Sequence, residues 1–473
     1  MKHPKKTIII GAGISGLTCA YYLQQWNLPM LVLEASGRPG GLISTTCRDG
    51  FLFESGPQSP RFNELLWKLI GELNLEREFI PGDPKAKRYI VKNGHLCKAP
   101  FSLGGLITTR LFGLRSKLRI LGEPLGLSHP PAEEETVADF MLRKFGQEIL
   151  DYLVDPIVAT VFFGDAQKMG MESAFPALVR WERESGSLAR GAIAARRRSS
   201  RERAMRGANS RGLGQRVTDS LPALGSFRQG MGVLTDAMAE KLAENILFGA
   251  KVVSIMQAAG NSEHPGCWIV RLQGGEEFAA ENLVMAVPSY AAARLLESFA
   301  PHISSLLGGV PHTPMAVVCA AYDRSTMRHQ LDGFGFMVPR REGLITFCTI
   351  WNSSLFEGRA PEEKVLMTSF VQASGESDLS GFPDDVLARM VGAETEKILG
   401  ATGRLVEQQV WKYPRAIPQY NLGHAEKIAE IRNALNAFPN LYLAGNYLDG
   451  RSIGECAQTG FRVAESLRSH FRG

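Results

Sequence analysis

Two hydrophobic patterns alternate along this chain: short apolar runs, and longer stretches in which apolar residues recur every three or four positions. The first run covers residues 6–10, and its β-branched side chains predict a buried strand. A glycine-rich turn follows at once, then a helical pattern over residues 17–26 and a second apolar run over residues 31–33. This order predicts a βαβ unit at the head of the chain.

The later patterns indicate a helical middle flanked by strands. A hairpin is expected over residues 87–96, because Asn93-Gly94 separates two strand patterns. Helical patterns cover residues 101–121 and 136–181. Further strands are predicted at residues 246–255, 267–272, 282–288, 315–322, 334–338, 344–351, 365–371 and 441–445, and further helices at residues 234–243, 384–400 and 458–471.

At 473 residues the chain is too long for one hydrophobic core, so two or three domains are expected. The predicted fold class is α/β: a discontinuous Rossmann-like nucleotide-binding domain, an α+β substrate domain and a helical, membrane-facing subdomain. The predicted boundaries are residues 1–82, 217–298 and 411–473 for the first domain, 83–99 and 299–410 for the second, and 100–216 for the helical subdomain.

Composition limits the compartment and the kind of site. Seven cysteines occur without a CxxC pair, and nine histidines occur without HxxH or HExxH spacing. This pattern disfavours a disulfide framework and a metal site, and it favours the cytoplasm. No apolar run reaches the roughly 18 residues that a membrane-spanning helix needs, and the first apolar run is too short for a signal peptide.

Basic charge gathers in the helical middle. Nine arginines and one acid, Glu202, lie between Ser187 and Arg216, and we interpret this segment as a flexible basic loop. It is either simply solvated or attracted to anionic lipid headgroups. Nucleic acid is not expected as a partner, because no aromatic residues interleave the arginines. An apolar stripe precedes the loop and indicates either a helix in a membrane interface or a helix packed on its own domain. The stripe consists of Leu103, Ile107, Leu111, Leu114, Leu118 and Leu121.

The glycine-rich turn has the spacing of a dinucleotide-binding loop. Gly11 makes the tight turn, Gly13 lets the backbone approach a pyrophosphate, and Gly16 allows helix and strand to pack closely. The helix N-terminus offers N–H groups and a partial positive charge to that pyrophosphate. Glu34 closes the second strand, where its carboxylate can accept hydrogen bonds from a ribose.

Residues 8–57, with the glycine doublet at Gly40-Gly41, resemble the glycine-doublet flavoproteins: amine oxidases, phytoene desaturases and protoporphyrinogen oxidases. Two segments are more specific: Lys87-Arg88-Tyr89 before the hairpin, and Ile417-Pro418-Gln419-Tyr420 followed by Leu422-Gly423-His424. Both resemble the oxygen-dependent protoporphyrinogen oxidase family, and the resemblance covers nearly the whole chain. Further matches are Ala99-Pro100, Phe175-Pro176, Phe227-Arg228-Gln229-Gly230-Met231 and Gly333-Phe334-Gly335-Phe336.

The resemblance implies an FAD-dependent oxidase of haem biosynthesis that converts protoporphyrinogen IX to protoporphyrin IX, with O₂ as the acceptor. The flavin carries the redox chemistry, so no catalytic side chain and no metal are expected. The implied FAD-binding residues are Gly11, Ala12, Gly13, Ile14, Ser15, Gly16, Glu34, Ala35, Arg38, Gly40, Gly41, Leu42, Gly56, Pro57, Gln58, Ser59, Val252, Trp411, Gly445, Asn446, Arg451, Ser452 and Ile453.

The resemblance also implies a substrate site. Arg88 would anchor a propionate, because a guanidinium pairs bidentately with a carboxylate and stays charged. An apolar slot for the macrocycle would be lined by Phe163, Gly164, Met337, Ile350 and Phe370.

The sequence departs from the family pattern at Arg451, which stands where the family usually has a small apolar residue. A cation there would either stabilise reduced flavin or point to solvent. A homodimer and a peripheral position on the cytoplasmic membrane are further expectations. Three alternatives stay open: a coproporphyrinogen III oxidase, an amine oxidase or phytoene desaturase, and a Rab-escort-like binding protein without flavin. The choice between O₂ and a membrane quinone as acceptor is also open.

Overall fold

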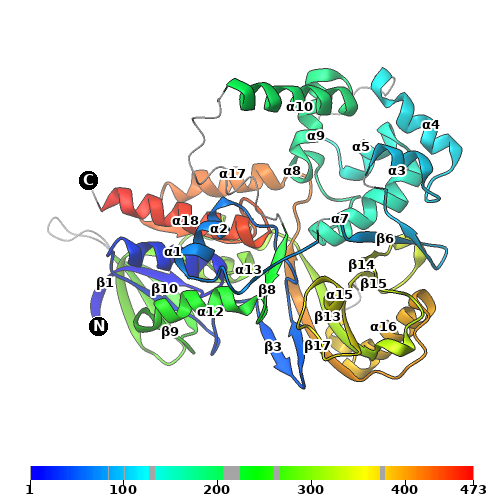
Figure 1. Ribbon diagram of the computed structural model, residues 1–473. Coiled ribbons are helices and arrows are strands. Elements are labelled where there is room, and N and C mark those ends of the chain that lie inside the picture. The colour runs from blue at the N-terminus through cyan, green and yellow to red at the C-terminus, as the bar shows by residue number, and fades with distance from the viewer. Residues whose placement is uncertain are drawn as a thin grey trace. The chain divides into compact units, whose positions relative to one another are not determined.

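The fold is described from a computed structural model, and its elements group into two compact units (Figure 1). The first unit consists of Met1–Gly82, Ala223–Pro311 and Glu426–Gly473, and the second of Asp83–Pro222 and His312–Ala425. Both units mix helices with a β-sheet, so the predicted α/β class is confirmed. The structure describes residues 2–83, 85–100, 102–126, 134–205, 224–258, 267–372 and 379–471.

The sheet of the first unit has a parallel centre. β1 pairs in parallel with β2 on one side and with β12 on the other, as the βαβ pattern predicted. β10 and β11 extend β12 in antiparallel fashion, and β18 pairs with the other end of β12 in parallel. The strands are β1 (Lys2–Ile10), β2 (Met30–Leu33), β9 (Ile246–Leu247), β10 (Val252–Ala258), β11 (Cys267–Leu272), β12 (Glu277–Met285) and β18 (Leu441–Leu443).

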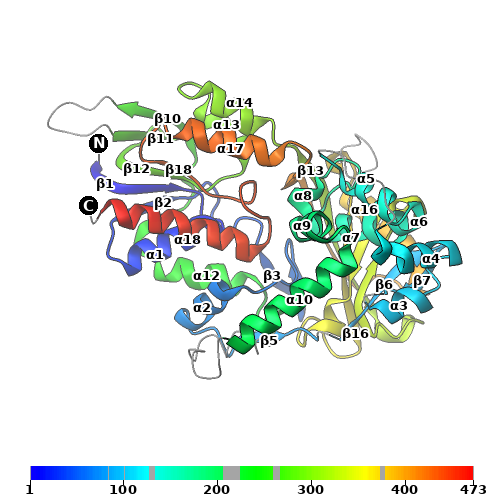
Figure 2. The same ribbon diagram turned by 90° about the horizontal axis from the view of Figure 1, so that it is seen from above.

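Alternate residues of β1 are buried on opposite faces of this sheet, which gives the first unit three layers. Ile9 packs with the helices of one face, whereas Ile8 and Ile10 pack with those of the other. Figure 2 shows the sheet between these two groups of helices. One group comprises α1 (Ile14–Gln25), α2 (Glu64–Glu72), α12 (Gly232–Lys241) and α18 (Ile453–His470), and the other comprises α13 (Ser289–Leu296), α14 (Pro301–Gly308) and α17 (His424–Leu435).

The second unit is built on a largely antiparallel sheet in the order β17-β13-β16-β15-β14-β6-β7. The predicted hairpin is confirmed as β6 and β7, with Asn93 and Gly94 both at positive φ. The helix α16 (Asp384–Leu399) packs on one face through Leu387 and Val391. The strands are β6 (Lys87–Lys92), β7 (His95–Lys98), β13 (His312–Asp323), β14 (Gly333–Met337), β15 (Thr346–Ile350), β16 (Lys364–Val371) and β17 (Glu407–Pro418).

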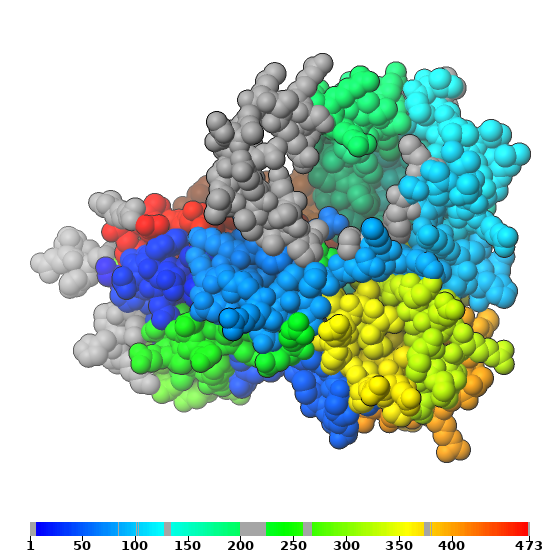
Figure 3. Space-filling view, in the orientation of Figure 1, coloured from blue at the N-terminus to red at the C-terminus, as the bar shows by residue number. Residues whose placement is uncertain are grey.

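The helical middle of the chain belongs to the second unit and forms part of the visible surface in Figure 3. Most of its helices are short, and buried residues of several of them, such as Phe140 and Val158, pack in one core with Ile90 and Met337 of the sheet. The helices are α3 (Leu103–Thr108), α4 (Leu114–Gly122), the 3₁₀ turn η1 (Glu123–Leu125), α5 (Val137–Lys144), α6 (Gln147–Ile149), the π-helical turn η2 (Leu150–Val154), α7 (Asp155–Phe162), α8 (Met171–Ala174), α9 (Pro176–Ser185) and α10 (Leu188–Met205).

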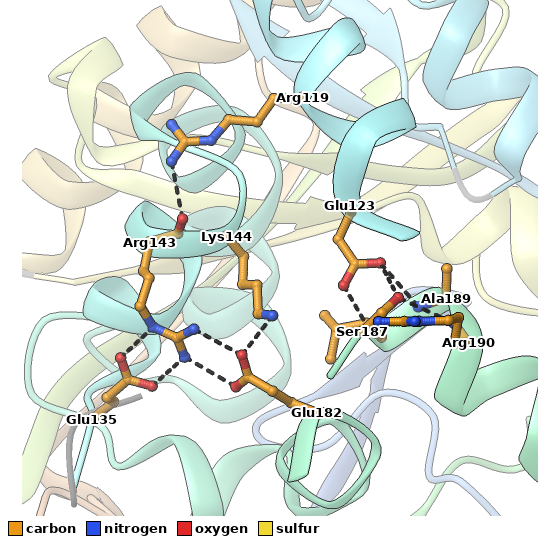
Figure 4. Close-up of polar contacts among 10 residues, drawn as sticks. Arg119, Glu123, Glu135, Arg143, Lys144, Glu182, Ser187, Ala189 and Arg190 are labelled. Carbon is orange, nitrogen blue, oxygen red and sulfur yellow. Dashed lines mark hydrogen bonds and ion pairs between the residues drawn. The ribbon is translucent and has the colours of Figure 1, made fainter. Parts of the chain in front are cut away.

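The prediction of a flexible basic loop is wrong for residues 188–205, which form helix α10; the rest of the predicted loop lies outside the described residues. Alanine and arginine are good helix formers. The N-terminus of α10 is capped in space by Glu123, whose carboxylate accepts from the N–H groups of Leu188 (2.6 Å) and Ala189 (3.1 Å) and from the Ser187 hydroxyl (2.9 Å) (Figure 4). A long-range contact therefore supports a helix that local composition did not reveal.

Buried ion pairs join α5 to α9 (Figure 4). Arg143 donates to Glu135 with two bonds of 2.6 and 2.7 Å and to Glu182 with bonds of 2.7 and 3.0 Å. The Lys144 ammonium lies 2.5 Å from the same Glu182 carboxylate. Because Lys144 and Glu182 are both buried, loss of either partner would leave an uncompensated charge between the two helices.

The structure does not form the single apolar stripe that the sequence predicted. Residues 103–121 form two helices rather than one, and Leu111 between them is fully buried. Leu114, Leu118 and Leu121 of α4 are exposed. Within the described part of the chain, no helix is long and apolar enough to span a bilayer, and no cluster of three or more His, Cys, Asp or Glu could hold a metal ion.

The two units differ from the three predicted domains at three places. Residues 299–311 group with the first unit, because α14 packs beside α13. Residues 411–425 group with the second unit, because β17 pairs with β13. The helical segment predicted as a subdomain of its own groups with the second sheet.

Candidate functional site

The glycine-rich turn connects β1 to α1 as predicted. Gly11 has φ +103°, and its N–H donates to the Leu33 carbonyl at 2.8 Å. A Cβ on Gly16 would lie 2.0 Å from the Gly11 carbonyl oxygen, so only glycine allows this approach of helix and strand. Gly13 is different, since a Cβ there would have no protein atom within 4 Å. Open space therefore lies where the motif would place a pyrophosphate.

The N-terminus of α1 suits an anion. Its N-cap is Gly13, so the cap residue has no side chain to occupy the first N–H groups, and no acidic residue stands in the first turn. The nearby Ser15 hydroxyl points elsewhere and donates to the Cys456 carbonyl at 2.9 Å. The helix end consequently keeps both its N–H groups and its partial positive charge for a phosphate.

Glu34 is held at the end of β2 by its own neighbours. One carboxylate oxygen accepts from the Ala12 N–H at 2.7 Å, and the other accepts from the Ser36 N–H (2.8 Å) and hydroxyl (2.7 Å). A carboxylate has about four acceptor positions, so capacity remains for a ribose hydroxyl. Ser36 was not among the predicted residues, although its place two residues after the acid is typical of an Asx-like turn.

The glycine doublet lies directly against the first turn. The Gly40 N–H donates to the Ala12 carbonyl at 2.8 Å, and Gly40 and Gly13 form a parallel bridge. The Arg38 guanidinium closes the loop by donating to the Gly41 carbonyl at 2.7 Å and to the Ile43 carbonyl at 3.1 Å. Arg38 thus shapes the doublet through its side chain.

A third segment, residues 54–59, packs behind the doublet. A Cβ on Gly56 would lie 2.1 Å from the Leu42 carbonyl oxygen. Gln58 donates to the Gly56 carbonyl at 2.9 Å. The buried Glu54, which was not predicted as a site residue, accepts from the Met231 N–H at 2.7 Å. Its place directly before Ser55-Gly56-Pro57, within the segment that resembles the flavoproteins, is the signal that could have found Glu54.

The C-terminal helix α18 packs against α1, the helix that follows the glycine-rich turn. Ser452 caps α18 in a capping box with Glu455. A Cβ on Gly460 of that helix would lie 2.0 Å from the Ser15 carbonyl oxygen, so α1 and α18 are in backbone contact. The predicted FAD residue Ser15 is thus in contact with α18, the helix that begins at the predicted residues Ser452 and Ile453, more than 400 positions later. The open space at Gly13 and the uncapped N-terminus of α1 fit the pyrophosphate of FAD. Val252 lies in β10 of the same sheet, whereas Trp411 lies in β17 of the second unit.

The predicted substrate residues lie in the second unit, and most share a sheet face. Arg88 in β6 pairs with Gly335 in β14, which pairs with Ile350 in β15. Paired residues of neighbouring strands point to the same side of the sheet. The Arg88 guanidinium lies 5.0 Å from the centre of the Phe334 ring, which is within the range of a cation–π contact.

The same face continues across the sheet. Met337 pairs with Cys348, which pairs with Phe370. Phe370 pairs with Val317, and Val317 pairs with Trp411 in β17. We call this side of the sheet the Arg88 face; it carries Arg88, Met337, Ile350, Phe370 and Trp411.

Phe163 and Gly164 form the turn after α7, at the edge of the Arg88 face. The Phe163 ring packs edge-on against Phe347 at 5.7 Å and against Phe370 at 5.6 Å between ring centres. The helical region covers this face at Met337, whereas Arg88 and Ile350 remain half-buried. All six predicted substrate residues therefore gather on one side of one unit.

Sequence comparison shows the family of the chain. The family described as flavin containing amine oxidoreductase matches residues 14–468. The chain belongs to this family. It is accordingly a flavoprotein oxidoreductase with FAD as its cofactor.

Two curated relatives and one solved structure refine the comparison. The chain is 31% identical to the chloroplastic protoporphyrinogen oxidase of Nicotiana tabacum, over 97% of this chain and 85% of that protein. It is 26% identical to the coproporphyrinogen III oxidase of Bacillus subtilis, over 96% of both. Its fold matches a structure named as a putative protoporphyrinogen oxidase from Exiguobacterium sp. 255-15, with a TM-score of 0.81 and 23% identity over 98% of this chain and 99% of that one.

Proposed function

We propose that this protein oxidises a porphyrinogen with FAD and O₂, and that protoporphyrinogen IX is the substrate. The observation that carries the proposal is the gathering of all six predicted substrate residues on and beside the Arg88 face. The relatives named protoporphyrinogen oxidase support the choice of substrate. Coproporphyrinogen III is the second candidate, because a relative of nearly full length bears that name.

Residues of the first unit would hold the cofactor. The N–H groups at the start of α1 and the glycine doublet would bind the pyrophosphate, and the remaining acceptor position of Glu34 would bind the ribose. Bound FAD would accept the electrons that the porphyrinogen loses. Arg451, next to the α18 cap, would lie near the flavin as the family resemblance implies.

Residues of the Arg88 face would hold the substrate. The Arg88 guanidinium, placed over the Phe334 ring, would bind one propionate by a bidentate ion pair. Ile350, Met337 and Phe370 would contact the apolar macrocycle, which is oriented by the propionate at its rim. The protein would thus supply orientation and exclusion of water, while proton and electron transfer depend on the cofactor.

The test is aerobic turnover of protoporphyrinogen IX and coproporphyrinogen III side by side, followed by porphyrin fluorescence. Wild-type protein should oxidise protoporphyrinogen faster. Arg88→Ala should raise KM about tenfold or more, since a charge-assisted hydrogen bond contributes roughly 1.5–3 kcal/mol. Arg389→Ala is the matched control, because Arg389 is exposed on α16 and pairs with Asp385 there. Inactivity of the wild type on both porphyrinogens would refute the proposal.

We also propose that the protein binds a membrane surface peripherally, through α4 and η1. Leu114, Leu118, Leu121 and Leu125 are 74%, 60%, 54% and 70% exposed. Their spacing of four, three and four residues places them on one side, and no residue of α4 is buried. The basic helix α10 starts beside η1, where Glu123 caps it, and would add attraction to anionic lipid.

Flotation with anionic vesicles at low salt tests this membrane proposal. Wild-type protein should float, and Leu118→Asp should reduce the floating fraction, because it places a charge among the exposed leucines. Val253→Asp is the control, since Val253 is also an exposed apolar residue (47%) but lies in the first unit. Wild-type protein that stays at the bottom would refute membrane binding.

Two further expectations stay predictions. Light scattering would test whether the protein is a homodimer, and anaerobic assays would test whether O₂ rather than a quinone is the acceptor.

A further inference from the structure

We propose that Gln419 and Arg340 are positioning residues that hold the Phe163-Gly164 turn, and that this fixes the Phe163 ring as a wall of the substrate slot. The inference rests on the proposed function, because it takes Phe163 as a slot residue. It also gives a physical role to Gln419, the polar residue in the most family-specific segment of the sequence.

The turn adopts a backbone conformation that needs support. Phe163 follows the last residue of α7 with φ 50° and ψ 31°, in the left-handed region. A bulky side chain is rare there, and such residues persist where their surroundings hold them. Residues kept in unusual conformations are concentrated at functional sites. The residues whose contacts oppose relaxation of Phe163 are therefore candidates for positioning residues.

Gln419 supplies the first of these contacts. Its side-chain N–H₂ donates to the Phe163 carbonyl at 3.1 Å and to the Ile417 carbonyl at 3.1 Å. Gln419 is buried, at 7% exposure, so water does not readily replace these bonds. The Thr313 hydroxyl donates to the same Phe163 carbonyl at the longer distance of 3.4 Å.

Arg340 supplies the second contact, one residue further along. Its guanidinium donates to the Gly164 carbonyl at 2.8 Å. The same group lies 2.7 Å from the Asp165 carboxylate and 3.6 Å from the Asp155 carboxylate. Two carboxylates thus orient the arginine, and the arginine orients the turn, so two consecutive carbonyl groups are held from different elements.

The rest of the motif runs beside the same loop. The Leu422 N–H donates to the Lys168 carbonyl at 3.0 Å, and the Gly170 N–H donates to the Tyr420 carbonyl at 3.2 Å. The Tyr420 ring stacks on His424, with ring centres 4.1 Å apart. The segment that resembled the family therefore acts as a backbone partner for residues 163–170.

The consequence concerns the aromatic wall. With both carbonyl groups held, the Phe163 ring packs against Phe347 and Phe370 of the sheet. Without the Gln419 bond, the backbone of Phe163 can relax towards the right-handed region, and the ring would leave this position. Substrate binding should then weaken while the cofactor site in the first unit is unaffected.

The experiment compares Gln419→Met, which keeps the side-chain length but removes the donor, with the wild-type holoenzyme. Thr395→Val is the matched control: the Thr395 hydroxyl is also buried and donates at 2.8 Å, but it lies in α16 on the opposite side of the sheet. Two readouts are needed: hydrogen exchange of the amides of residues 164–169, which requires no substrate, and KM and kcat with protoporphyrinogen IX. FAD content and the flavin absorbance spectrum serve as checks.

Gln419→Met should accelerate exchange in this loop about fivefold, which corresponds to one hydrogen bond of about 1 kcal/mol, and should raise KM by a similar factor. The flavin spectrum should not change, and Thr395→Val should alter neither readout. Faster exchange with an unchanged KM would overturn the positioning role. Unchanged exchange would overturn the claim that Gln419 holds the turn. If Gln419→Met does not fold, Thr313→Val should show the same two changes at smaller size, and their absence would also overturn the proposal. A wild type inactive on porphyrinogens would instead count against the proposed function, while the exchange result still decides whether the turn is held.

Discussion

Replacement of Gly13 by alanine should separate binding of the cofactor from folding. Gly13 has φ −71° and ψ 174°, an extended conformation that alanine adopts without strain. A Cβ there would meet no protein atom within 4 Å. The apoprotein should accept the methyl group, and the change is expected to stabilise it slightly, by about 0.4–1 kcal/mol, because alanine restricts the unfolded chain.

The same methyl group would stand in front of the α1 N-terminus, where the pyrophosphate of FAD needs the N–H groups. Displacing the phosphate from a single charge-assisted hydrogen bond costs roughly 1.5–3 kcal/mol, which is about 10- to 150-fold in affinity. The holoprotein would then lose the stabilisation that ligand binding contributes. Gly13→Ala should therefore bind FAD at least tenfold more weakly.

The assay is titration of apoprotein with FAD, followed by quenching of flavin fluorescence, with thermal unfolding measured with and without FAD. Gly274→Ala is the control, because a Cβ on Gly274 would also meet no protein atom within 4 Å. Gly274 lies in the turn between β11 and β12, outside the predicted FAD site. This control variant should bind FAD as the wild type does. A Gly13→Ala protein with wild-type affinity would refute the argument that this open space receives the pyrophosphate.

Two further predictions concern the helical region. Glu182→Gln should lower the free energy of unfolding by about 3 kcal/mol in urea titrations, because it removes the buried negative charge that Arg143 and Lys144 share and leaves Arg143 with the Glu135 carboxylate. Burial alone would raise the pKa of Glu182, but hydrogen bonds from Arg143 and Lys144 hold it below the ordinary 4.5. The stability that the network contributes should thus be complete above pH 4.5 and be lost as pH falls through the lower pKa of Glu182 in the folded state. If the wild type and Glu182→Gln lost stability equally at low pH, this pH dependence would be contradicted. Gly191→Val should lower the melting temperature and the helical circular dichroism, because a Cβ at Gly191 would lie 2.3 Å from the Trp181 Cβ and force α9 and α10 apart. Unchanged values would contradict this prediction, because they would mean that the two helices accept the side chain.

Much of the candidate site could be predicted from local sequence. The turn from Gly11 to Gly16, Glu34 and the Gly40-Gly41 doublet act through backbone geometry within a few residues, so their spacing alone indicates a nucleotide site. The hairpin at Asn93-Gly94 is predictable for the same reason. The identity of the cofactor needed family resemblance, because spacing does not distinguish one dinucleotide from another.

Contacts between distant segments could not be predicted in this way. The sequence predicts a loop where helix α10 lies, because the contact that supports this helix comes from Glu123, some 65 residues earlier. Leu111 fits the exposed stripe by spacing, yet it is buried where α3 ends and α4 begins. The role of Gln419 depends on Phe163, 256 residues away.

The sequence by itself determined the βαβ unit, its glycine turns and most strands of both sheets, because each depends on conformational preferences and side-chain periodicity within about ten residues. It did not predict β17, and the one strand predicted over residues 246–255 is divided into β9 and β10. The tertiary structure alone decided that Ser15 meets Cys456, that Arg88 and Phe370 share a sheet face, and that Gln419 holds Phe163. These contacts depend on strand order and helix packing, which bring together residues whose separation along the chain carries no periodic signal.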